Sequence, residues 1–274
     1  MRGIKVLVIG DIVIDHYPAS RKDYIGGSAT NVALTISRNN PGFQVDLLGV
    51  IGSDQPAWQL FSRLNETNLN LDKIIRLPGK TARATWKRIG PETELVKVDK
   101  GIDQGIPLKY LMNINFDDYD LVHATPYSLG INDIKYLKNQ SKNFSFDASF
   151  ILGQKEIINL IPGTNWFFIS GDLARNDHWI GELKTFPEEG LILLKGEEGL
   201  SFINNNLQNK LEIKSGFKNN VYDDLGAGDV FIGYLLSNYY KDFNKNHLKN
   251  LLEKASEAAG KACQYEGASN LSLV

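Results

Sequence analysis

The segment from Asp223 to Asp229 carries the residues of this chain that are best suited to chemistry. It reads Asp-Asp-Leu-Gly-Ala-Gly-Asp, and the apolar spacing after it, from Val230 to Leu235, predicts a helix with one buried face. A glycine turn that opens a helix leaves backbone N–H groups without partners at the positive end of the helix dipole, where a phosphate can approach closely. Asp229 would repel a phosphate, but it can take a proton from a hydroxyl that attacks one. The segment therefore predicts phosphoryl transfer to an alcohol.

A second segment, Gly26-Gly27-Ser28-Ala29-Thr30-Asn31, precedes another helical spacing that starts at Val32. Two adjacent glycines permit a tight turn with the backbone close to a ligand. Asn31 lies about one helical turn in, and its amide offers both a donor and an acceptor to a hydroxyl. The segment therefore predicts either a hydroxyl-binding turn or a loop that only caps a helix.

A third segment, Gly10-Asp11-Ile12-Val13-Ile14-Asp15, directly follows the apolar run Ile4–Ile9. Ligands of open α/β sheets bind beyond the carboxyl ends of the strands, where carboxylates can hold sugar hydroxyls or a metal ion. The alternative is that Asp11 and Asp15 are turn and surface residues.

Two further features are candidates for the nucleotide side. Asp223 and Asp224 stand about one helical turn before Asp229, and acidic groups there can reach magnesium through water, because bound magnesium keeps several waters. The turn Gly196-Glu197-Glu198-Gly199 fits a loop beside a nucleotide, although most such turns are only turns. The sequence contains no Walker A motif, which excludes P-loop enzymes, and no Cys/His cluster that would indicate zinc.

The elements that must position these residues alternate between short apolar runs and helical spacings. Strands are predicted at Ile4–Ile9, Val45–Val50, Leu121–His123, Phe144–Phe146, Trp166–Ile169 and Leu191–Leu194. Helices are predicted around 29–36, 58–64 and 248–262, with Asp54 as the N-cap of the second helix and Pro56 in its first turn. This alternation predicts a mostly parallel sheet that is covered on both faces.

Two regions, 12–25 and 74–98, do not fit this alternation. In the second region Ala82, Ala84 and Trp86 alternate with polar residues, a period of two that is typical of a strand. We expect the two regions to form a small antiparallel sheet that covers the site and excludes water.

Composition limits the class of protein. The chain has 274 residues, with 42% hydrophobic and 23% charged residues, as in an ordinary globular protein. Lys plus Arg total 30 and Asp plus Glu total 32, a formal charge of −2 that argues against nucleic acid as the main partner. Cys263 is the only cysteine, so no intrachain disulfide can form and a reducing compartment is expected. The first apolar run is too short for a signal peptide or a membrane span, which predicts a cytoplasmic protein without a membrane partner.

These segments together resemble the two signatures of the PfkB (ribokinase-like) sugar kinase family. Gly26-Gly27…Asn31 matches the early signature, and Asp223…Gly226-Ala227-Gly228-Asp229 matches the late one, over essentially the full chain. The chain also resembles the fructoselysine/fructosamine 6-kinase branch, through 10–17, 120–124, 146–147 and 264–268. The resemblance implies a single kinase domain over 1–274, a three-layer α/β/α sandwich with a mostly parallel central sheet, and a small antiparallel β lid formed by insertions at about 12–25 and 74–98.

The resemblance also implies roles for individual residues. Asp229 would be the general base, and the N–H groups of Gly226, Ala227 and Gly228 would form the anion hole. The sugar would be bound by Asp15, Gly26, Gly27 and Asn31. The nucleotide would be bound by Gly196, Gly199, Asp223, Gly267 and Ala268, and Asp223 would act on the metal indirectly.

Two positions depart from the family pattern. Asp224 stands where the family usually has Thr, which adds a negative charge near the triphosphate. The family's Asn-x-x-Glu motif should fall near Gly171 to Ala174, but neither signature side chain is present, and Asp172 or Asp177 would have to substitute. These departures put magnesium handling in question.

The expected activity is ATP-dependent transfer of the γ-phosphoryl group to a primary hydroxyl of a sugar or a sugar-amine such as fructoselysine. ATP and Mg²⁺ are the expected cofactors, and a need for K⁺ is left open. One alternative is another acceptor, namely ribose, fructose, ketodeoxygluconate or a nucleoside. The other is a catalytically weak, sugar-binding regulatory protein. A homodimer through the lid is a further expectation, because an open strand edge favours association.

Overall fold

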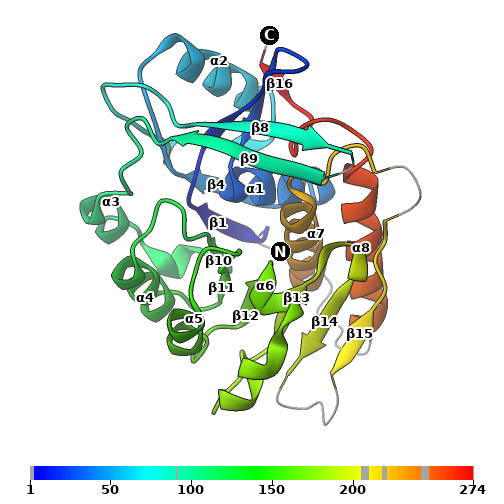
Figure 1. The fold of residues 1–274 in the computed structure, drawn as a ribbon. Helices are drawn as coiled ribbons and strands as arrows, with labels where there is room; N and C mark the ends of the chain where they lie inside the picture. The colour runs from blue at the N-terminus through cyan, green and yellow to red at the C-terminus, as the bar shows by residue number, and fades with distance from the viewer. Residues whose placement is uncertain (1–2, 91, 205–209, 218–220, 242–246, 274) are drawn as a thin grey trace.

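The computed structural model describes residues 3–90, 92–204, 210–217, 221–241 and 247–273. Its centre is a nine-stranded sheet in the order β15-β14-β13-β12-β11-β10-β1-β4-β6 (Figure 1). Only the pairings of β14 with β13 and with β15 are antiparallel within this sheet, so the predicted mostly parallel sheet is confirmed. The strands are β1 (Lys5–Ile9), β4 (Gln44–Leu48), β6 (Leu69–Asn70), β10 (Leu121–Ala124), β11 (Phe144–Asp147), β12 (Trp166–Ile169), β13 (Gly190–Leu194), β14 (Leu200–Ile203) and β15 (Leu211–Ile213).

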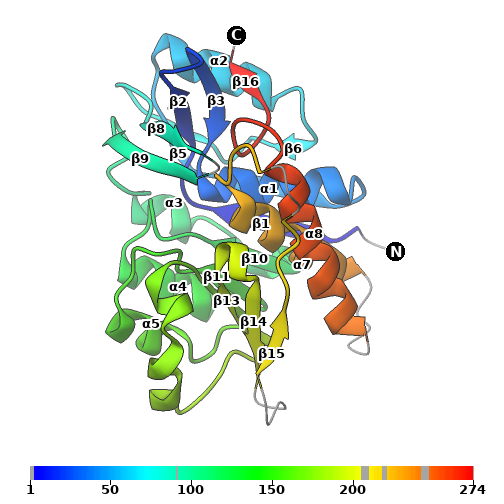
Figure 2. The same cartoon turned by 45° about the vertical axis from the view of Figure 1, so that its right-hand side comes forward.

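Helices cover both faces of this sheet, as Figure 2 shows. One face carries α1 (Ser28–Asn39), α7 (Ala227–Lys241) and α8 (Leu248–Ala262), with α2 (Gln55–Leu64) beside them. The other face carries α3 (Leu108–Met112), α4 (Ile131–Gln140), α5 (Gln154–Leu160) and α6 (Asp172–Arg175). Each layer has its own buried apolar cluster, which is why the central strands are apolar on both sides. None of the helices in the described parts of the chain is long and apolar enough to cross a membrane.

The predicted strands and helices occur close to their expected positions, with one error. Asp54 caps α2 as predicted, because its Oδ1 accepts the Ala57 N–H at 3.2 Å. The run Val45–Val50 is not one strand: β4 ends at Leu48, and β5 (Val50–Ile51) pairs instead with β7 (Ile75–Arg76) in a separate sheet. The break falls at Gly49, where a Cβ would stand 2.6 Å from the Gly10 carbonyl oxygen. Only glycine lets the two chain segments approach this closely.

A five-stranded sheet, which we call the lid sheet, lies across one end of the central sheet in Figure 1. Its order is β16 (Ser272–Leu273), β3 (Lys22–Gly26), β2 (Val13–Tyr17), β8 (Arg83–Ile89) and β9 (Glu92–Asp99). Both regions that were set apart in the sequence contribute to it. Two details differ from the expectation: β2 and β8 run parallel, and the C-terminal strand β16 adds a strand that no sequence pattern indicated.

A β-bulge in the lid sheet decides which side chains face inward. Trp86 pairs with Leu95 and Thr85 with Lys97, so Val96 is an extra residue on β9. The extra residue shifts the alternation of the strand by one position. Leu95 and Val98, which are three residues apart, therefore both line the cavity beneath the lid sheet.

Candidate active site

A cavity of about 870 Å³ lies between the lid sheet, the ends of several central strands and the start of α7. It brings together residues that are far apart in the sequence. The predicted site residues on its wall are Asp15, Gly27, Asn31, Gly196, Gly226, Ala227, Gly228 and Asp229. The wall is strongly acidic. Its described charged residues are the two cations Lys100 and Arg175 and the nine carboxylates of Asp11, Asp15, Glu92, Glu94, Asp103, Asp147, Glu197, Asp224 and Asp229.

Asp229 lies in the first turn of α7 and is held by two side chains from α1. Ser28 Oγ donates to its Oδ1 at 2.7 Å, and Asn31 Nδ2 donates to its Oδ2 at 2.9 Å. The segment 26–31, which was predicted to bind hydroxyls, thus contains the start of α1 and orients the Asp229 carboxylate. Burial raises the pKa of Asp229 to about 8, against the lowering effect of these two hydrogen bonds, and the nearby Asp147 and Asp11 raise it further.

The turn before Asp229 requires glycine at Gly226. This residue has φ +76°, and a Cβ there would stand 2.2 Å from the Ala268 Cβ. The close packing places the C-terminal loop directly behind the turn. The Ala227 N–H donates to the Asp224 carbonyl oxygen at 3.2 Å, so the turn is closed on itself at that amide.

Asp11 holds the beginning of α1. Its Oδ2 accepts the Ser28 N–H at 2.8 Å, and its Oδ1 accepts the Ala29 N–H at 3.2 Å and the Thr125 hydroxyl at 2.9 Å. An acidic side chain is favourable at a helix N-terminus. Asp11 therefore serves as the cap that α1 lacks in its own sequence, and burial raises its pKa.

Asp15 faces the cavity from β2 and rests on Gly26. A Cβ on Gly26 would stand 1.9 Å from Asp15 Oδ2, so Gly26 makes room for this carboxylate and does not itself line the cavity. Trp86 Nε1 donates to Asp15 Oδ1 at 2.8 Å across the lid sheet. Burial raises the pKa of Asp15 to about 7, and the charges of Asp11 and Asp223 add to the rise.

Asp147 is a cavity carboxylate to which sequence reasoning gave no role. It is the last residue of β11, and its Oδ1 accepts the Ser149 N–H at 2.8 Å. Burial raises its pKa to about 7, and Asp11 raises it further. Its place at the end of an apolar run was the available signal, since that is the position that drew attention to Asp11 and Asp15.

Asp223 is fully engaged within the protein. Its Oδ2 accepts the Tyr17 hydroxyl at 2.7 Å and the Gly267 N–H at 2.9 Å. Its Oδ1 accepts the Thr93 hydroxyl at 2.6 Å and the Leu225 N–H at 3.0 Å. A carboxylate has about four acceptor positions, and all are used here. Asp223 therefore shapes the turn before Asp229 and, as placed, has no oxygen directed at a metal ion.

Three other predicted nucleotide-binding residues do not lie on the described cavity wall. A Cβ on Gly199 would stand 2.1 Å from the Ile213 carbonyl oxygen, so this glycine serves the packing of β14 against β15. Gly267 and Ala268 lie behind the glycine turn, through the contacts with Asp223 and Gly226 described above. Their predicted contact with the nucleotide stays a prediction.

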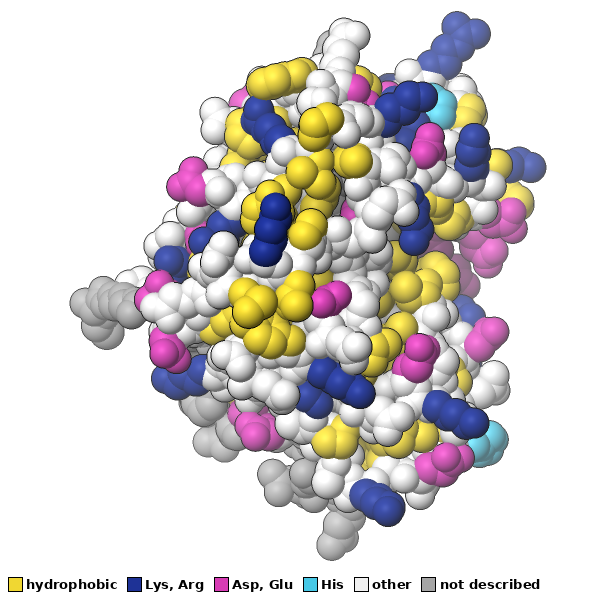
Figure 3. Space-filling model, turned by 90° about the vertical axis from the view of Figure 1, so that its left-hand side faces the viewer, with side chains coloured by type: hydrophobic (Ala, Val, Ile, Leu, Met, Phe, Trp, Pro, Cys, Tyr) yellow, Lys and Arg dark blue, Asp and Glu magenta, His cyan; other side chains and the backbone are white. Residues whose placement is uncertain are grey.

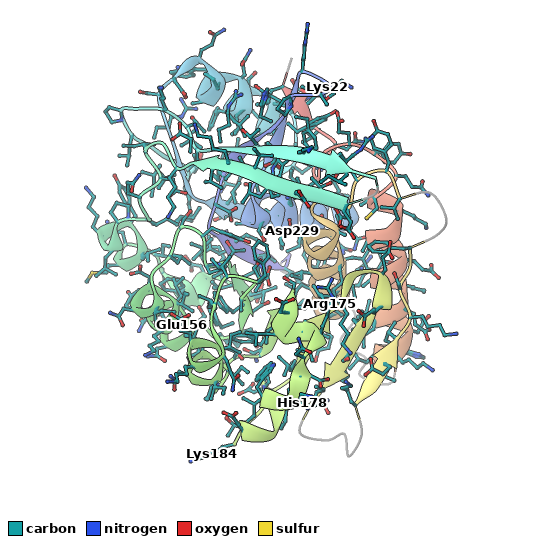
Figure 4. The ribbon with its side chains drawn as sticks, in the orientation of Figure 1. Lys22, Glu156, Arg175, His178, Lys184 and Asp229 are labelled. Carbon is teal, nitrogen blue, oxygen red and sulfur yellow. The ribbon has the colours of Figure 1, made fainter. Side chains whose placement is uncertain are left out.

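Arg175 is the cation on the side of the cavity that Gly196 lines. Its guanidinium approaches Glu198 at 3.7 Å and Asp172 at 4.0 Å, and neither distance is a close ion pair. Figure 4 shows Arg175 on α6, across from Asp229. Neither proposed substitute for the Asn-x-x-Glu motif reaches the cavity wall: the Asp172 side chain is 96% exposed, and Asp177 pairs with Lys210 at 2.5 Å.

One cavity wall thus combines Asp229 and the glycine turn with carboxylates under the lid sheet and with Gly196 and Arg175. We call the part under the lid sheet the acceptor half and the part with Gly196 and Arg175 the nucleotide half. Among the described residues, no group of three or more His, Cys, Asp or Glu side chains could hold a metal ion.

Several known proteins resemble this chain in sequence. A family profile described as pfkB family carbohydrate kinase matches residues 147–273. Fructosamine kinase FrlD of Bacillus subtilis (strain 168) is 28% identical, with 97% of this chain and 93% of that protein covered. Fructoselysine 6-kinase of Escherichia coli (strain K12) is 24% identical, with 95% of this chain and 97% of that protein covered.

Solved structures show the same fold. A fructokinase from Xylella fastidiosa with bound ATP superposes with a TM-score of 0.78 at 18% identity, covering 96% of this chain and 93% of that one. An aminoimidazole riboside kinase from Salmonella enterica, in complex with aminoimidazole riboside and an ATP analogue, gives 0.77 at 17% identity, with 97% and 96% covered. The predicted ribokinase-like sandwich with a β lid is therefore confirmed.

Proposed function

This chain belongs to the pfkB family of carbohydrate kinases, and from that premise we propose that its acceptor is a sugar-amine such as fructoselysine. Membership makes the protein an ATP-dependent phosphotransferase with an alcohol group as acceptor. The proposed reaction transfers the γ-phosphoryl group of ATP to a primary hydroxyl of the sugar part. The observation that carries the proposal is the accumulation of buried carboxylates in the acceptor half of the cavity.

Asp229 takes the proton from the attacking hydroxyl in this proposal. Ser28 and Asn31 fix both of its oxygens, so the carboxylate is oriented before the substrate arrives. Its pKa of about 8 is close to the pH of a cell, where a general base is most effective. The N–H groups of Gly226 and Gly228, together with that of Ala227 once it leaves the Asp224 carbonyl oxygen, receive the charge that develops on the transferred group.

The acceptor is held at the carboxylate-rich end. Asp15 and Asn31 bind hydroxyls of the sugar, and Gly27 lets the backbone approach it. The charge of Asp11 raises the pKa values of Asp15, Asp147 and Asp229, and the charge of Asp147 raises that of Asp229 further. An amine beside the sugar is positively charged and would stabilise the charged forms of these carboxylates. A neutral sugar such as fructose offers no such compensation, which favours a sugar-amine.

The nucleotide occupies the other half. Gly196 lies along it, and Arg175 donates to its phosphates, since a guanidinium binds phosphate oxygens in a two-pronged manner. Magnesium typically uses one or two protein carboxylates together with substrate phosphates, and Glu197 is the wall carboxylate beside Gly196. The residues thus fit a magnesium ion carried by ATP, which would neutralise phosphate charge during transfer.

The proposal also covers the cellular location and the oligomeric state of the protein. One kinase domain spans residues 1–274 and works in the cytoplasm, where ATP is available. β9 is an edge of the lid sheet, and its Val96 is 60% exposed. Figure 3 shows exposed hydrophobic side chains among charged ones on the side of the molecule where α3 lies in Figure 1. An exposed apolar strand edge favours pairing, so we propose a homodimer through the lid.

An acceptor screen tests the proposed function. The purified protein is incubated with MgATP and single acceptors, including fructoselysine, other fructosamines, fructose, ribose, ketodeoxygluconate and a nucleoside, and ADP release is measured. We expect the highest kcat/KM with a fructosamine. The phosphorylated product of that reaction should carry its phosphate on a primary hydroxyl.

The charge argument has its own control within the screen. Fructoselysine is compared with an analogue that is acetylated on the nitrogen attached to the sugar. This nitrogen can then no longer carry a charge. We expect the analogue to bind at least 10-fold more weakly, because one charge-assisted contact is lost. Equal kcat/KM for both, or a preference for a neutral sugar, would contradict the proposed acceptor. Calorimetry that shows sugar binding but no turnover with any acceptor would favour the regulatory alternative.

A further inference from the structure

Thr93 lies where the lid sheet meets the turn that precedes Asp229. It is the second residue of β9, at the tip of the β8–β9 hairpin. Its N–H donates to Asp224 Oδ1 at 2.9 Å, and its hydroxyl donates to Asp223 Oδ1 at 2.6 Å. One residue of the lid therefore holds two consecutive carboxylates of the turn.

The oxygen that receives the Thr93 hydroxyl also organises the turn itself. Asp223 Oδ1 accepts the Leu225 N–H at 3.0 Å, and Asp223 is only 1% exposed. Loss of the Thr93 hydroxyl would leave this buried carboxylate with fewer donors, and buried carboxylates need their donors. The position of Leu225 and of Gly226 after it thus depends on a contact made by the lid.

The other strand of the hairpin makes a second contact with the same region. The Arg88 guanidinium lies 3.7 Å from the ring centroid of Tyr222, the residue before Asp223. Arg88 also approaches Glu266 at 4.0 Å, next to Gly267, whose N–H bonds to Asp223. In Figure 1 the tip of the hairpin accordingly lies beside the segment that leads into α7.

We propose that Thr93 is a positioning residue for phosphoryl transfer, which joins the seating of the lid to the shaping of the glycine turn that receives the phosphoryl group. The proposal rests on the proposed function, because it gives the lid and the turn the roles described there. It also accounts for Asp224 at a position where the resemblance predicts Thr. Asp224 lies on the cavity wall, and the Thr93 N–H that donates to its Oδ1 partly offsets its negative charge. Without that bond, the full charge of Asp224 would repel the triphosphate.

The proposal predicts a specific behaviour of the enzyme. Binding of the acceptor seats the lid, and the seated lid weakens the repulsion from Asp224, so the acceptor and ATP bind more tightly together than apart. ATP without an acceptor meets a repelling carboxylate and a loose turn, which limits hydrolysis of ATP by water.

Thr93→Val is the test variant, since it removes the hydroxyl while it keeps the branched shape and the amide. Thr85→Val is the matched control, because Thr85 lies on the other face of the same hairpin and outside the described cavity wall. With saturating acceptor and MgATP, we expect Thr93→Val to lower kcat by about 10-fold, the factor for one hydrogen bond to a charged group. We expect its KM for the acceptor to change less, and its ADP release per acceptor phosphorylated to rise. A kcat and a coupling ratio equal to those of Thr85→Val would overturn the proposal.

Hydrogen exchange separates this proposal from the question of the acceptor, because it requires no turnover. In the free protein, Thr93→Val should speed amide exchange both in residues 92–95 and in the turn 223–228, relative to wild type and to Thr85→Val. Faster exchange in the hairpin alone would show that the lid and the turn are not joined, even in an enzyme whose acceptor is known. An enzyme that phosphorylates no fructosamine but shows exchange changes in both segments would contradict the acceptor and retain the role of Thr93.

Discussion

Asn31 and Asp229 lie 198 residues apart in the chain, and the Asn31 amide donates to the Asp229 carboxylate at 2.9 Å. The contact exists because α1 and α7 pack closely beside each other. A Cβ on Gly233 of α7 would stand 2.6 Å from the Thr35 Cβ of α1, so glycine is needed at this crossing. The N-terminal ends of two helices are thereby brought to one carboxylate. A developing negative charge at this point meets the positive ends of both helix dipoles.

Replacement of the base gives the most direct prediction. Asp229→Asn keeps the size of the side chain but cannot accept a proton, so kcat should fall on the order of 10²–10⁴-fold. Binding of ATP and of the acceptor, measured by calorimetry, should change little. Asp72→Asn is the control, because Asp72 is an exposed carboxylate outside the described cavity wall. A turnover rate near that of wild type would remove Asp229 from the role of base.

The same replacement should change stability in a pH-dependent manner. Burial raises the pKa of Asp229 to about 8, so between about pH 4 and pH 8 the folded protein binds more protons than the unfolded chain. The free energy of unfolding of the wild type therefore falls as pH rises through this window. Asp229→Asn removes this loss and should be more stable than wild type by about 0.5–2 kcal/mol at pH 8.5, with no gain near pH 4. Urea unfolding at both pH values measures the difference, and a gain that is equal at both would contradict the raised pKa.

Ser28 tunes the base, which predicts a shift in the pH profile. The Ser28 hydroxyl donates to Asp229 and lowers its pKa, so Ser28→Ala should raise that pKa further. The rising limb of kcat/KM against pH should then move to higher pH, with a smaller loss of rate at pH 9 than at pH 7. The backbone N–H of Ser28, which bonds to Asp11, is unchanged in this variant. A loss of rate that is the same at every pH would indicate a purely structural role.

The sequence was sufficient to predict six of the nine central strands, because buried parallel strands are short apolar runs with clear limits, but it did not indicate β6, β14 or β15. It was insufficient for α4 and α5, where only Ile134, Leu137, Ile157 and Leu160 are buried, too few to stand out as a stripe. The fifth lid strand, β16, has two residues and acquires its conformation from pairing with β3, which no local pattern records.

The site residues likewise divide into those that local sequence predicts and those that only the tertiary structure brings to the cavity. Asp229 and the glycine turn were recognised because their chemistry lies in one continuous segment. Thr93 and Arg175 were not, since each reaches the cavity only through tertiary packing. Asp223 illustrates the reverse case: its type and position suggested a metal role, whereas the fold surrounds it with four donors, three of them from distant segments. Neighbours that come from distant parts of the chain cannot be deduced from spacing.

Arg175 provides a test of the nucleotide half. Arg175→Gln removes the charge and the two-pronged donor, so the KM for ATP should rise on the order of 10-fold, while the KM for the acceptor stays the same. Arg175→Lys should recover part of the loss, because the charge returns without the fork. Lys155→Gln on α5 is the control, since it removes the same charge from an exposed residue outside the described cavity wall. An unchanged KM for ATP in Arg175→Gln would place the triphosphate away from α6.

Trp86 tests the acceptor half from the lid side. Trp86→Phe keeps an aromatic ring over the cavity but removes the N–H that donates to Asp15 at 2.8 Å. That hydrogen bond lowers the pKa of Asp15, so its loss should leave more of the carboxyl protonated at neutral pH. A protonated Asp15 is a weaker acceptor for sugar hydroxyls, and the KM for the acceptor should rise on the order of 10-fold at pH 7 and less at pH 9. Trp58→Phe is the control, because Trp58 is 58% exposed and lies on α2, outside the described cavity wall. If acceptor KM in Trp86→Phe follows that of Trp58→Phe at both pH values, Asp15 does not bind the sugar as a carboxylate.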